Sequence, residues 1–232
     1  MTKTEFKNTV SDSLFPVLND AIYEYVLTLI IEHHFVPGEK INMTQIADDL
    51  EVSRSPVRAA LERLADEGLV VRTGQRGYAT SKIEWDDCLA LYKTRELIEG
   101  FAAYEAADKI TPEGLAGLEK IISRSKKHSD EHNLIAFLQD DFDFHREIVV
   151  LAGNSHLLRA YDSLSIWIRS YQHLIRSYQT EEYIQQVGAI EKHIAICKSL
   201  KAHHALEAKD QAERHIQHIY FSLASLISKN HQ

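Results

Sequence analysis

The residues best suited to chemistry are a carboxylate and three imidazoles in the second half of the chain. Asp141 and His145 are four residues apart in a stretch with helical apolar spacing, so their side chains lie together on one helix face. This is a common geometry for two metal ligands from one helix. His193 and His215 stand among apolar residues, so we expect both imidazoles to face the interior. Buried imidazoles need polar partners, and a metal ion held by all four residues is the simplest partner.

Spacing alone leaves other interpretations open for these residues. The chain has 13 histidines, so an acidic residue four positions before a histidine is expected by chance. A core histidine bonded to a backbone carbonyl is also more common than a metal ligand. His218, three residues after His215, is a further candidate for the last ligand. Trp167 and Tyr171, one turn apart, are either pocket wall or plain core.

Helices are the elements that must position these residues. The chain has 232 residues, of which 44% are apolar, so it can bury a sizeable core. Its 9 glycines and 4 prolines are too few for an all-β chain of this length, and we expect a mainly α protein. No apolar run approaches the length of a membrane span, which predicts a soluble protein.

Charge and cysteine content limit the partners and the compartment. The net charge of −8 repels nucleic acid on average, so any contact with nucleic acid must be local. Cys88 and Cys197 are too few for a disulfide framework, and Lys3, Glu5 and Lys7 at the start are unlike a signal peptide. We therefore expect a cytoplasmic protein.

The pattern of apolar residues and turn signals divides the chain into two domains. Residues 1–80 predict three helices and a β-hairpin, and residues 81–232 predict a bundle of about six helices. The expected helices cover residues 18–34, 41–50, 53–67, 84–109, 112–129, 131–152, 155–178, 181–204 and 208–229, and the expected strands cover residues 69–72 and 78–80. Ser53 is the expected N-cap of the third helix, and Gly68 its end.

Two helices joined by a tight turn and followed by a hairpin predict a winged helix-turn-helix. Arg54, Ser55 and Arg58 share the helix face opposite the apolar residues, and arginine forks suit guanine edges and phosphates. In the hairpin, Arg72 and Arg76 flank Gly74, where a narrow turn can approach a groove of double-stranded DNA. The alternative is a solvated helix face whose arginines pair with acidic neighbours such as Glu62.

The N-terminal residues resemble the winged-helix domain of GntR-type bacterial transcription regulators. The resemblance rests on Phe35-Val36-Pro37-Gly38, Val52-Ser53-Arg54-Ser55-Pro56-Val57-Arg58, Leu61, Leu64, Glu67-Gly68-Leu69-Val70 and Arg76-Gly77. It implies that Arg54, Ser55 and Arg58 lie in or beside the major groove and that the wing around Gly74 enters the minor groove. Two residues depart from the family pattern. Glu51 stands where glycine is common in the turn, which implies strain, and Thr44 stands where many members place a DNA-contacting arginine.

The C-terminal residues look like the all-helical effector domain of the FadR-type branch of that superfamily. The resemblance rests on Arg95-Glu96-Leu97-Ile98-Glu99, Asp141-Phe142-Asp143-Phe144-His145, Gly153-Asn154, His193 and His215. In metal-binding members, one aspartate and three histidines line a central cavity, which implies Asp141, His145, His193 and His215 as ligands here. Zn²⁺, Ni²⁺ and Mn²⁺ all suit this set, which leaves positions open for a carboxylate effector. Arg95 is the candidate for holding the effector, and a surface pair with Glu99 is the alternative.

Together these features predict a homodimeric transcription regulator that binds a palindromic operator and responds to a small carboxylate at a divalent metal. A metal-dependent hydrolase is the runner-up, because an open position on such a metal can activate water. It lacks a convincing general base and leaves the arginine-bearing helix without a role. A third interpretation makes the metal purely structural.

Overall fold

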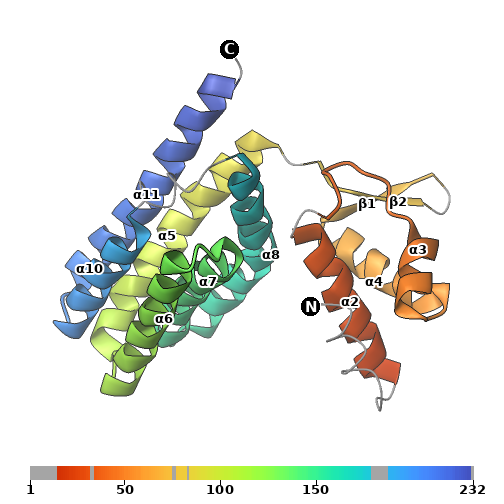
Figure 1. Cartoon of the computed structure of the whole chain (residues 1–232). Coiled ribbons are helices and arrows are strands. Elements are labelled where there is room, and N and C mark those ends of the chain that lie inside the picture. Colours follow the sequence, from red (N-terminus) through yellow and green to blue (C-terminus); the bar gives the residue numbers. More distant parts are fainter. Residues whose placement is uncertain (1–14, 32–33, 75–76, 83, 179–187, 231–232) are drawn as a thin grey trace. The chain divides into compact units, whose positions relative to one another are not determined.

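The computed structural model describes residues 15–31, 34–74, 77–82, 84–178 and 188–230 (Figure 1). These residues form a mainly helical protein, and the chain divides into two compact units, Met1–Ile83 and Glu84–Gln232. The predicted architecture, a winged helix-turn-helix followed by an all-helical bundle, is confirmed. No helix of the described residues is long and apolar enough to cross a membrane.

The first unit contains three helices and one antiparallel hairpin. Its elements are α2 (Phe15–Ile31), α3 (Met43–Leu50), α4 (Arg54–Asp66), β1 (Val70–Thr73) and β2 (Gly77–Thr80). In the hairpin, Arg72 pairs directly with Tyr78, and a single bridge joins Ala79 to Lys40. Both strands reach further toward the turn than predicted. Helix α2 starts three residues before the predicted start at residue 18.

The corner between α3 and α4 carries local strain. Glu51 ends α3 in the left-handed conformation, with φ +58° and ψ +39°, so a glycine-favouring position holds a side chain. The N–H of Val52 donates to the Ala47 carbonyl at 2.9 Å and closes the helix end. Ser53 is the N-cap of α4, as predicted, although its side chain makes no capping hydrogen bond. Gly68, with φ +84°, follows the end of α4, which confirms the predicted stop.

The described residues of the second unit form the expected six helices. These are α5 (Trp85–Lys109), α6 (Pro112–Asp130), α7 (Leu134–Leu151), α8 (Ser155–Tyr178), α10 (Ala189–Lys201) and α11 (Ala205–Asn230). Helices α5 and α11 pack side by side along much of their length (Figure 1).

Two predicted boundaries were wrong for the same reason. The helix predicted over 131–152 starts at Leu134, because His132 is left-handed (φ +53°) and Asn133 caps the helix through its side chain. The helix predicted over 181–204 ends at Lys201, because His203 is also left-handed (φ +55°). Its predicted start lies outside the described residues. Neither turn contains a glycine or proline that would mark these ends.

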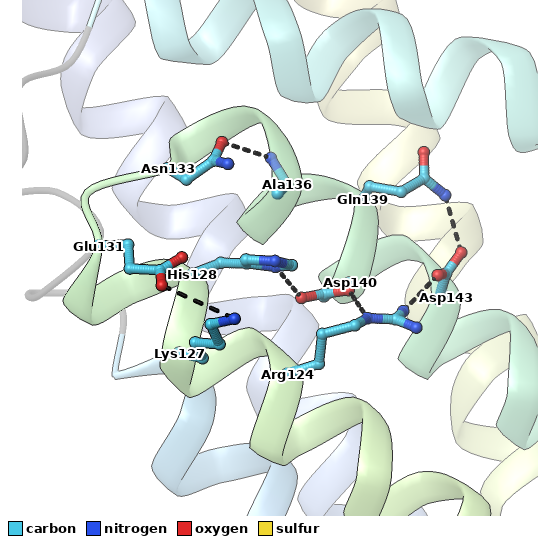
Figure 2. Close-up of polar contacts among 9 residues, drawn as sticks. All are labelled: Arg124, Lys127, His128, Glu131, Asn133, Ala136, Gln139, Asp140 and Asp143. Atoms are coloured by element: carbon cyan, nitrogen blue, oxygen red, sulfur yellow. Dashed lines mark hydrogen bonds and ion pairs between the residues drawn. The ribbon is translucent and has the colours of Figure 1, made fainter.

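A cluster of polar contacts fixes α6 against α7, the helix that carries Asp141 and His145 (Figure 2). The Asp140 carboxylate, only 2% exposed, accepts hydrogen bonds from the Arg124 guanidinium and from His128 Nδ1, the latter at 2.7 Å. Arg124 Nη2 also donates to Asp143 at 2.7 Å. One buried carboxylate thereby joins two side chains of α6 to the helix that positions the candidate metal ligands.

Candidate metal centre and nucleic-acid interface

The structure brings together all four residues that were predicted to bind metal. Helix α7 supplies Asp141 and His145, α10 supplies His193, and α11 supplies His215. Each of the four is at most 6% exposed. Their ligand atoms all lie within 4.8 Å of one another. Three helices that are distant in the sequence therefore converge on one polar point inside an otherwise apolar bundle.

The distances between the ligand atoms suit a small divalent cation. His145 Nε2 lies 3.1 Å from His215 Nε2 and 3.3 Å from His193 Nε2. Asp141 Oδ1 lies 3.4 Å from His193 Nε2 and 3.9 Å from His145 Nε2. Metal–ligand bonds of about 2.1 Å place neighbouring ligands about 3.0 to 3.4 Å apart at angles between 90° and tetrahedral. Nitrogen and carboxylate donors at these separations fit Zn²⁺, Ni²⁺ and Mn²⁺ alike.

Burial keeps the site in a protonation state that favours a cation. It lowers the pKa of His193 and of His215 well below the usual value, so both imidazoles are neutral and offer a lone pair. Burial also raises the pKa of Asp141, an effect that the nearby His145 opposes. Gln172 Nε2 donates to Asp141 Oδ2 at 2.7 Å and leaves Oδ1 to face the histidines. The Phe144 ring stacks on His193, with centroids 4.0 Å apart, and fixes its plane.

Glu99 of α5 completes the site from behind His145. Its Oε2 lies 2.8 Å from His145 Nδ1, and its Oε1 accepts from Arg95 Nε at 2.7 Å. Burial raises the pKa of Glu99, but Arg95 and His145 lower it to about 2, so the carboxylate is ionised. A carboxylate at Nδ1 places the proton there and leaves Nε2 free to ligate. The contact between Glu99 and His145 was not predicted, because only Arg95 was considered as a partner of Glu99. A glutamate on the alanine-rich face that includes Ala102, Ala103 and Ala106 was the available signal.

The Arg95–Glu99 pair is not a surface pair. Both side chains are almost fully buried, and the Arg95 guanidinium lies over the Tyr92 ring. Among the described residues, Arg95 Nη1 and Nη2 have no hydrogen-bond partner, and neither has the buried hydroxyl of Tyr161. Unsatisfied buried donors are costly, and a fork of two guanidinium nitrogens matches a carboxylate. His218 is exposed and lies outside the cluster, so it is not the fourth ligand. Tyr171 is buried and Trp167 half-buried.

In the first unit, α4 presents the predicted charged face. Arg54, Ser55 and Arg58 are exposed, whereas the apolar residues on the opposite side of the helix are buried. Glu62, which the alternative interpretation paired with an arginine of its own helix, bonds instead to Arg72 of the wing. Arg54 and Arg58 form no ion pair with any described residue.

The remaining predicted contact residues have different surroundings. Thr44 is half-buried in the first turn of α3. Arg72 is held by Glu62 and by Asp66, the latter at 2.9 Å. Gly74 has φ +60° at the wing tip, where an added Cβ would meet no other atom within 4 Å. Arg76 lies outside the described residues.

A winged helix-turn-helix followed by a helical domain with a buried aspartate–histidine cluster defines a class of DNA-binding transcription regulators. The comparison with known families agrees. Residues 18–79 match the family described as bacterial regulatory proteins, gntR family, and residues 90–218 match the FCD domain. The chain belongs to the GntR family, in the group whose C-terminal part is an FCD domain.

Individual relatives are also transcription regulators. The chain is 34% identical to the Nta operon transcriptional regulator of Aminobacter aminovorans over 60% of this chain and 66% of that protein. It is 26% identical to the HTH-type regulator YdhC of Bacillus subtilis over 84% of this chain and 86% of that one. The repressor RspR of Escherichia coli is 29% identical over 62% of this chain and 64% of its own length. The chain thus spans just under two thirds of two of these relatives.

Solved structures confirm the fold. McbR/YncC of E. coli superposes with a TM-score of 0.77 over 91% of this chain and 98% of that one, at 16% identity. A GntR transcriptional regulator from Rhodococcus sp. RHA1 gives a TM-score of 0.71 over 90% and 97%, at 17% identity. At these identities the likeness concerns the architecture alone.

Proposed function

We propose that this GntR-family regulator binds a palindromic operator as a homodimer and that a small carboxylate, bound at a divalent metal in the second unit, controls that binding. The convergence of Asp141, His145, His193 and His215 within 4.8 Å carries the metal part of the proposal. A partly filled coordination shell leaves positions at which a carboxylate can bind. Because the target is DNA, we place the protein in the bacterial cytoplasm.

Arg95 supports an anionic effector. Its two terminal nitrogens and the Tyr161 hydroxyl are buried donors that find no partner in the part of the chain that the structure describes. The Arg95 side chain is already oriented by Glu99, which also contacts a ligand histidine, so an anion between Arg95 and the metal would meet both positive groups. We propose that Arg95 binds both oxygens of one carboxylate of the effector and that another oxygen of the effector coordinates the metal.

DNA binding is assigned to the first unit. We propose that Arg54, Ser55 and Arg58 at the start of α4 contact base edges and phosphates, with Thr44, Gly74 and Arg76 at the flanks. Two copies related by a twofold axis present two such helices to two half-sites. Effector binding changes operator affinity by a coupling free energy that is typically about 1 to 3 kcal/mol.

Metal and effector binding can be tested together. The purified chain is stripped of metal, reloaded with Zn²⁺, Ni²⁺ or Mn²⁺, and screened by thermal unfolding against mono-, di- and tricarboxylates. We expect one ion per chain and at least one carboxylate that raises the unfolding temperature of the loaded protein only. His215→Ala should lose the ion, and His218→Ala, on the same helix, should keep it. Arg95→Lys should keep the ion and lose the effector response, because lysine lacks the guanidinium fork.

Other outcomes would redirect the proposal. Turnover of a stabilising carboxylate or its ester would favour the hydrolase. An ion that no carboxylate responds to, and whose removal dissociates the dimer, would favour a structural metal. For DNA binding, Arg58→Ala should abolish binding to a duplex selected from random DNA and leave metal content unchanged. Unchanged affinity at moderate salt would contradict the assignment of α4.

A further inference from the structure

The wing of the first unit is joined to α4 through one glutamate. Glu62 lies on α4, and its Oε2 accepts from Arg72 Nε at 2.8 Å, while its Oε1 accepts from the Tyr78 hydroxyl. Arg72 and Tyr78 are direct cross-strand partners in the hairpin, so both donors come from the same step of the ladder. Asp66, one turn further along α4, accepts from Arg72 Nη2 at 2.9 Å.

This arrangement neutralises Arg72 within the protein. Its guanidinium lies between the carboxylates of Asp66 and Glu62. The hydrogen bonds to these two carboxylates are the main cause of the raised pKa of Arg72. The hydrogen bond from Tyr78 and then those from Arg72 lower the pKa of Glu62, so the carboxylate stays ionised. A phosphate that approached Arg72 would have to compete with both carboxylates and would be repelled by them.

The anchoring is built into the base of the wing. The Tyr78 side chain is only 5% exposed, so the hydroxyl extends from a fixed ring toward α4. The Glu62 carboxylate bonds to Arg72 on β1 and to Tyr78 on β2. It therefore determines the rotation of the hairpin relative to α4, because moving either strand breaks one of the two contacts. Arg54 and Arg58 are exposed side chains without ion-pair partners among the described residues. Arg58, one turn before Glu62, is near enough to lower the pKa of Glu62 and of Tyr78.

We propose that Glu62, Arg72 and Tyr78 form a clamp that sets the angle between the DNA-reading helix and the wing, and that Arg72 is a positioning residue for DNA binding and not a phosphate contact. The clamp rests on the proposed DNA-binding role of α4 and the wing. It assigns to Glu62 a role in specificity, because a wing held at a fixed angle matches only duplexes whose grooves present the right shape.

Salt dependence separates a positioning arginine from one that contacts phosphate. Dissociation constants are measured at several salt concentrations for a duplex selected by the wild-type chain and for an unrelated duplex of equal length. The variants are Arg72→Ala, Glu62→Ala, Glu62→Gln, the Glu62→Ala/Arg72→Ala double variant, and Arg54→Ala as the positive control. Loss of one phosphate contact lowers the slope of log K against log salt by about one.

The clamp predicts a specific pattern. Arg54→Ala should reduce the slope of log K against log salt by about one. Arg72→Ala should leave this slope unchanged, but the ratio of the affinity for the selected duplex to the affinity for the unrelated duplex should fall about tenfold. Glu62→Ala should lower that ratio by a similar factor. Because only Asp66 then holds Arg72, it should also strengthen binding to the unrelated duplex and steepen its slope by less than one. The double variant should lose this gain and show no further drop in the ratio, because both changes break one contact. Glu62→Gln, which keeps an acceptor for Tyr78, should fall between wild type and Glu62→Ala.

The opposite results are equally clear. If Arg72→Ala lowers the slope as Arg54→Ala does, Arg72 is a phosphate contact and the clamp is overturned. If the effects of Glu62→Ala and Arg72→Ala on the ratio add in the double variant, the two residues act separately and the clamp is again overturned. Wild-type protein that binds no duplex at low salt would overturn the proposed function itself. Circular dichroism of each variant verifies that the exposed substitutions leave the fold intact.

Discussion

Glu99 and His145 face each other across the boundary between α5 and α7, with Glu99 Oε2 2.8 Å from His145 Nδ1. The contact lies behind the ligand cluster, because His145 Nε2 is directed at the other histidines. Glu99 also holds Arg95, so a single carboxylate orients a candidate ligand and a candidate effector-binding cation. The candidate metal site and the proposed effector site therefore share one supporting residue.

This sharing makes Glu99→Gln a sensitive variant. A glutamine amide at this position donates to His145 Nδ1 and shifts the imidazole proton to Nε2, where it blocks coordination. We expect metal affinity to fall about 10- to 100-fold and the free energy of unfolding to fall by about 3 kcal/mol, because Arg95 keeps a buried charge. Competition with a chromophoric chelator measures the metal affinity, and urea unfolding of the metal-free protein measures the free energy of unfolding. Glu96→Gln, on the same helix, should change neither, and equal affinities for the two variants would exclude the orienting role.

The left-handed Glu51 predicts a stabilising substitution. A residue with a Cβ at φ +58° costs roughly 1 kcal/mol relative to glycine. Glu51→Gly should therefore raise the stability of the first unit by about 0.5 to 1 kcal/mol, part of the gain being lost to the greater freedom of unfolded glycine. Urea unfolding of the isolated residues 1–83, if that piece folds, or of the full chain provides the measurement. Glu39→Gly, elsewhere in the unit, should not stabilise it.

The contacts in Figure 2 predict unequal effects for two neighbouring aspartates. Asp140→Asn should lower the free energy of unfolding by about 1 to 3 kcal/mol, because a buried acceptor of two hydrogen bonds loses its charge. Asp143→Asn should cost less than about 1 kcal/mol, because that side chain is 35% exposed and its ion pair is partly solvated. Thermal or urea unfolding of the two variants shows which substitution lowers the free energy of unfolding more. A larger loss for Asp143→Asn would contradict the greater contribution of the buried Asp140.

The two cysteines predict how stability depends on alkaline pH. Burial raises the pKa of Cys88 and of Cys197 to about 12, whereas unfolded thiols titrate at about 8.5 to 9. Above pH 9 the unfolded chain therefore holds fewer protons than the native chain, so stability falls as pH rises. The loss should reach about 1.5 to 2 kcal/mol per thiol by pH 10. Urea unfolding of wild type and of the Cys88→Ala/Cys197→Ala variant at pH 8 and 10 should show a steeper decline for wild type.

Thiol labelling gives an independent measurement of the same burial. Native protein at pH 8.5 should react with a thiol reagent far more slowly than unfolded protein, because the thiolate is both scarce and inaccessible. Rapid labelling of both thiols without unfolding would contradict the assigned burial.

Most of the helices could be predicted because apolar spacing and caps agree along the chain. Ser53 and Gly68 bound α4 as predicted, and α8 spans the predicted residues 155–178. Missed boundaries include those at His132 and His203, where a left-handed histidine ends or precedes a helix without a glycine. Histidine adopts the left-handed conformation more often than most residues, but a histidine in the sequence does not by itself mark a helix end. Helices α2 and α11 also start three residues before the predicted residues 18 and 208.

The four candidate ligands could be predicted from the sequence, but the residues that contact and orient them could not. His145, His193 and His215 lie among apolar residues at helical spacing, and the family resemblance selected them from thirteen histidines and placed His215 before His218. Glu99 and Gln172 belong to other helices, α5 and α8, and meet the ligands only through the packing of the bundle. No spacing within one segment reports such contacts, which is why the Arg95–Glu99 pair was also a candidate surface pair.

Helix α5 starts at Trp85, the second residue of its unit, and runs without a break past Glu99. Fourteen residues of unbroken helix form a stiff rod about 21 Å long. A reorientation of about 5° at the Glu99 end would swing the opposite end by about 2 Å. A rotation of α5 that is too small to disturb the packing around Glu99 would therefore move Trp85 by a larger distance. Trp85 lies at the end of α5 that follows the first unit in the chain.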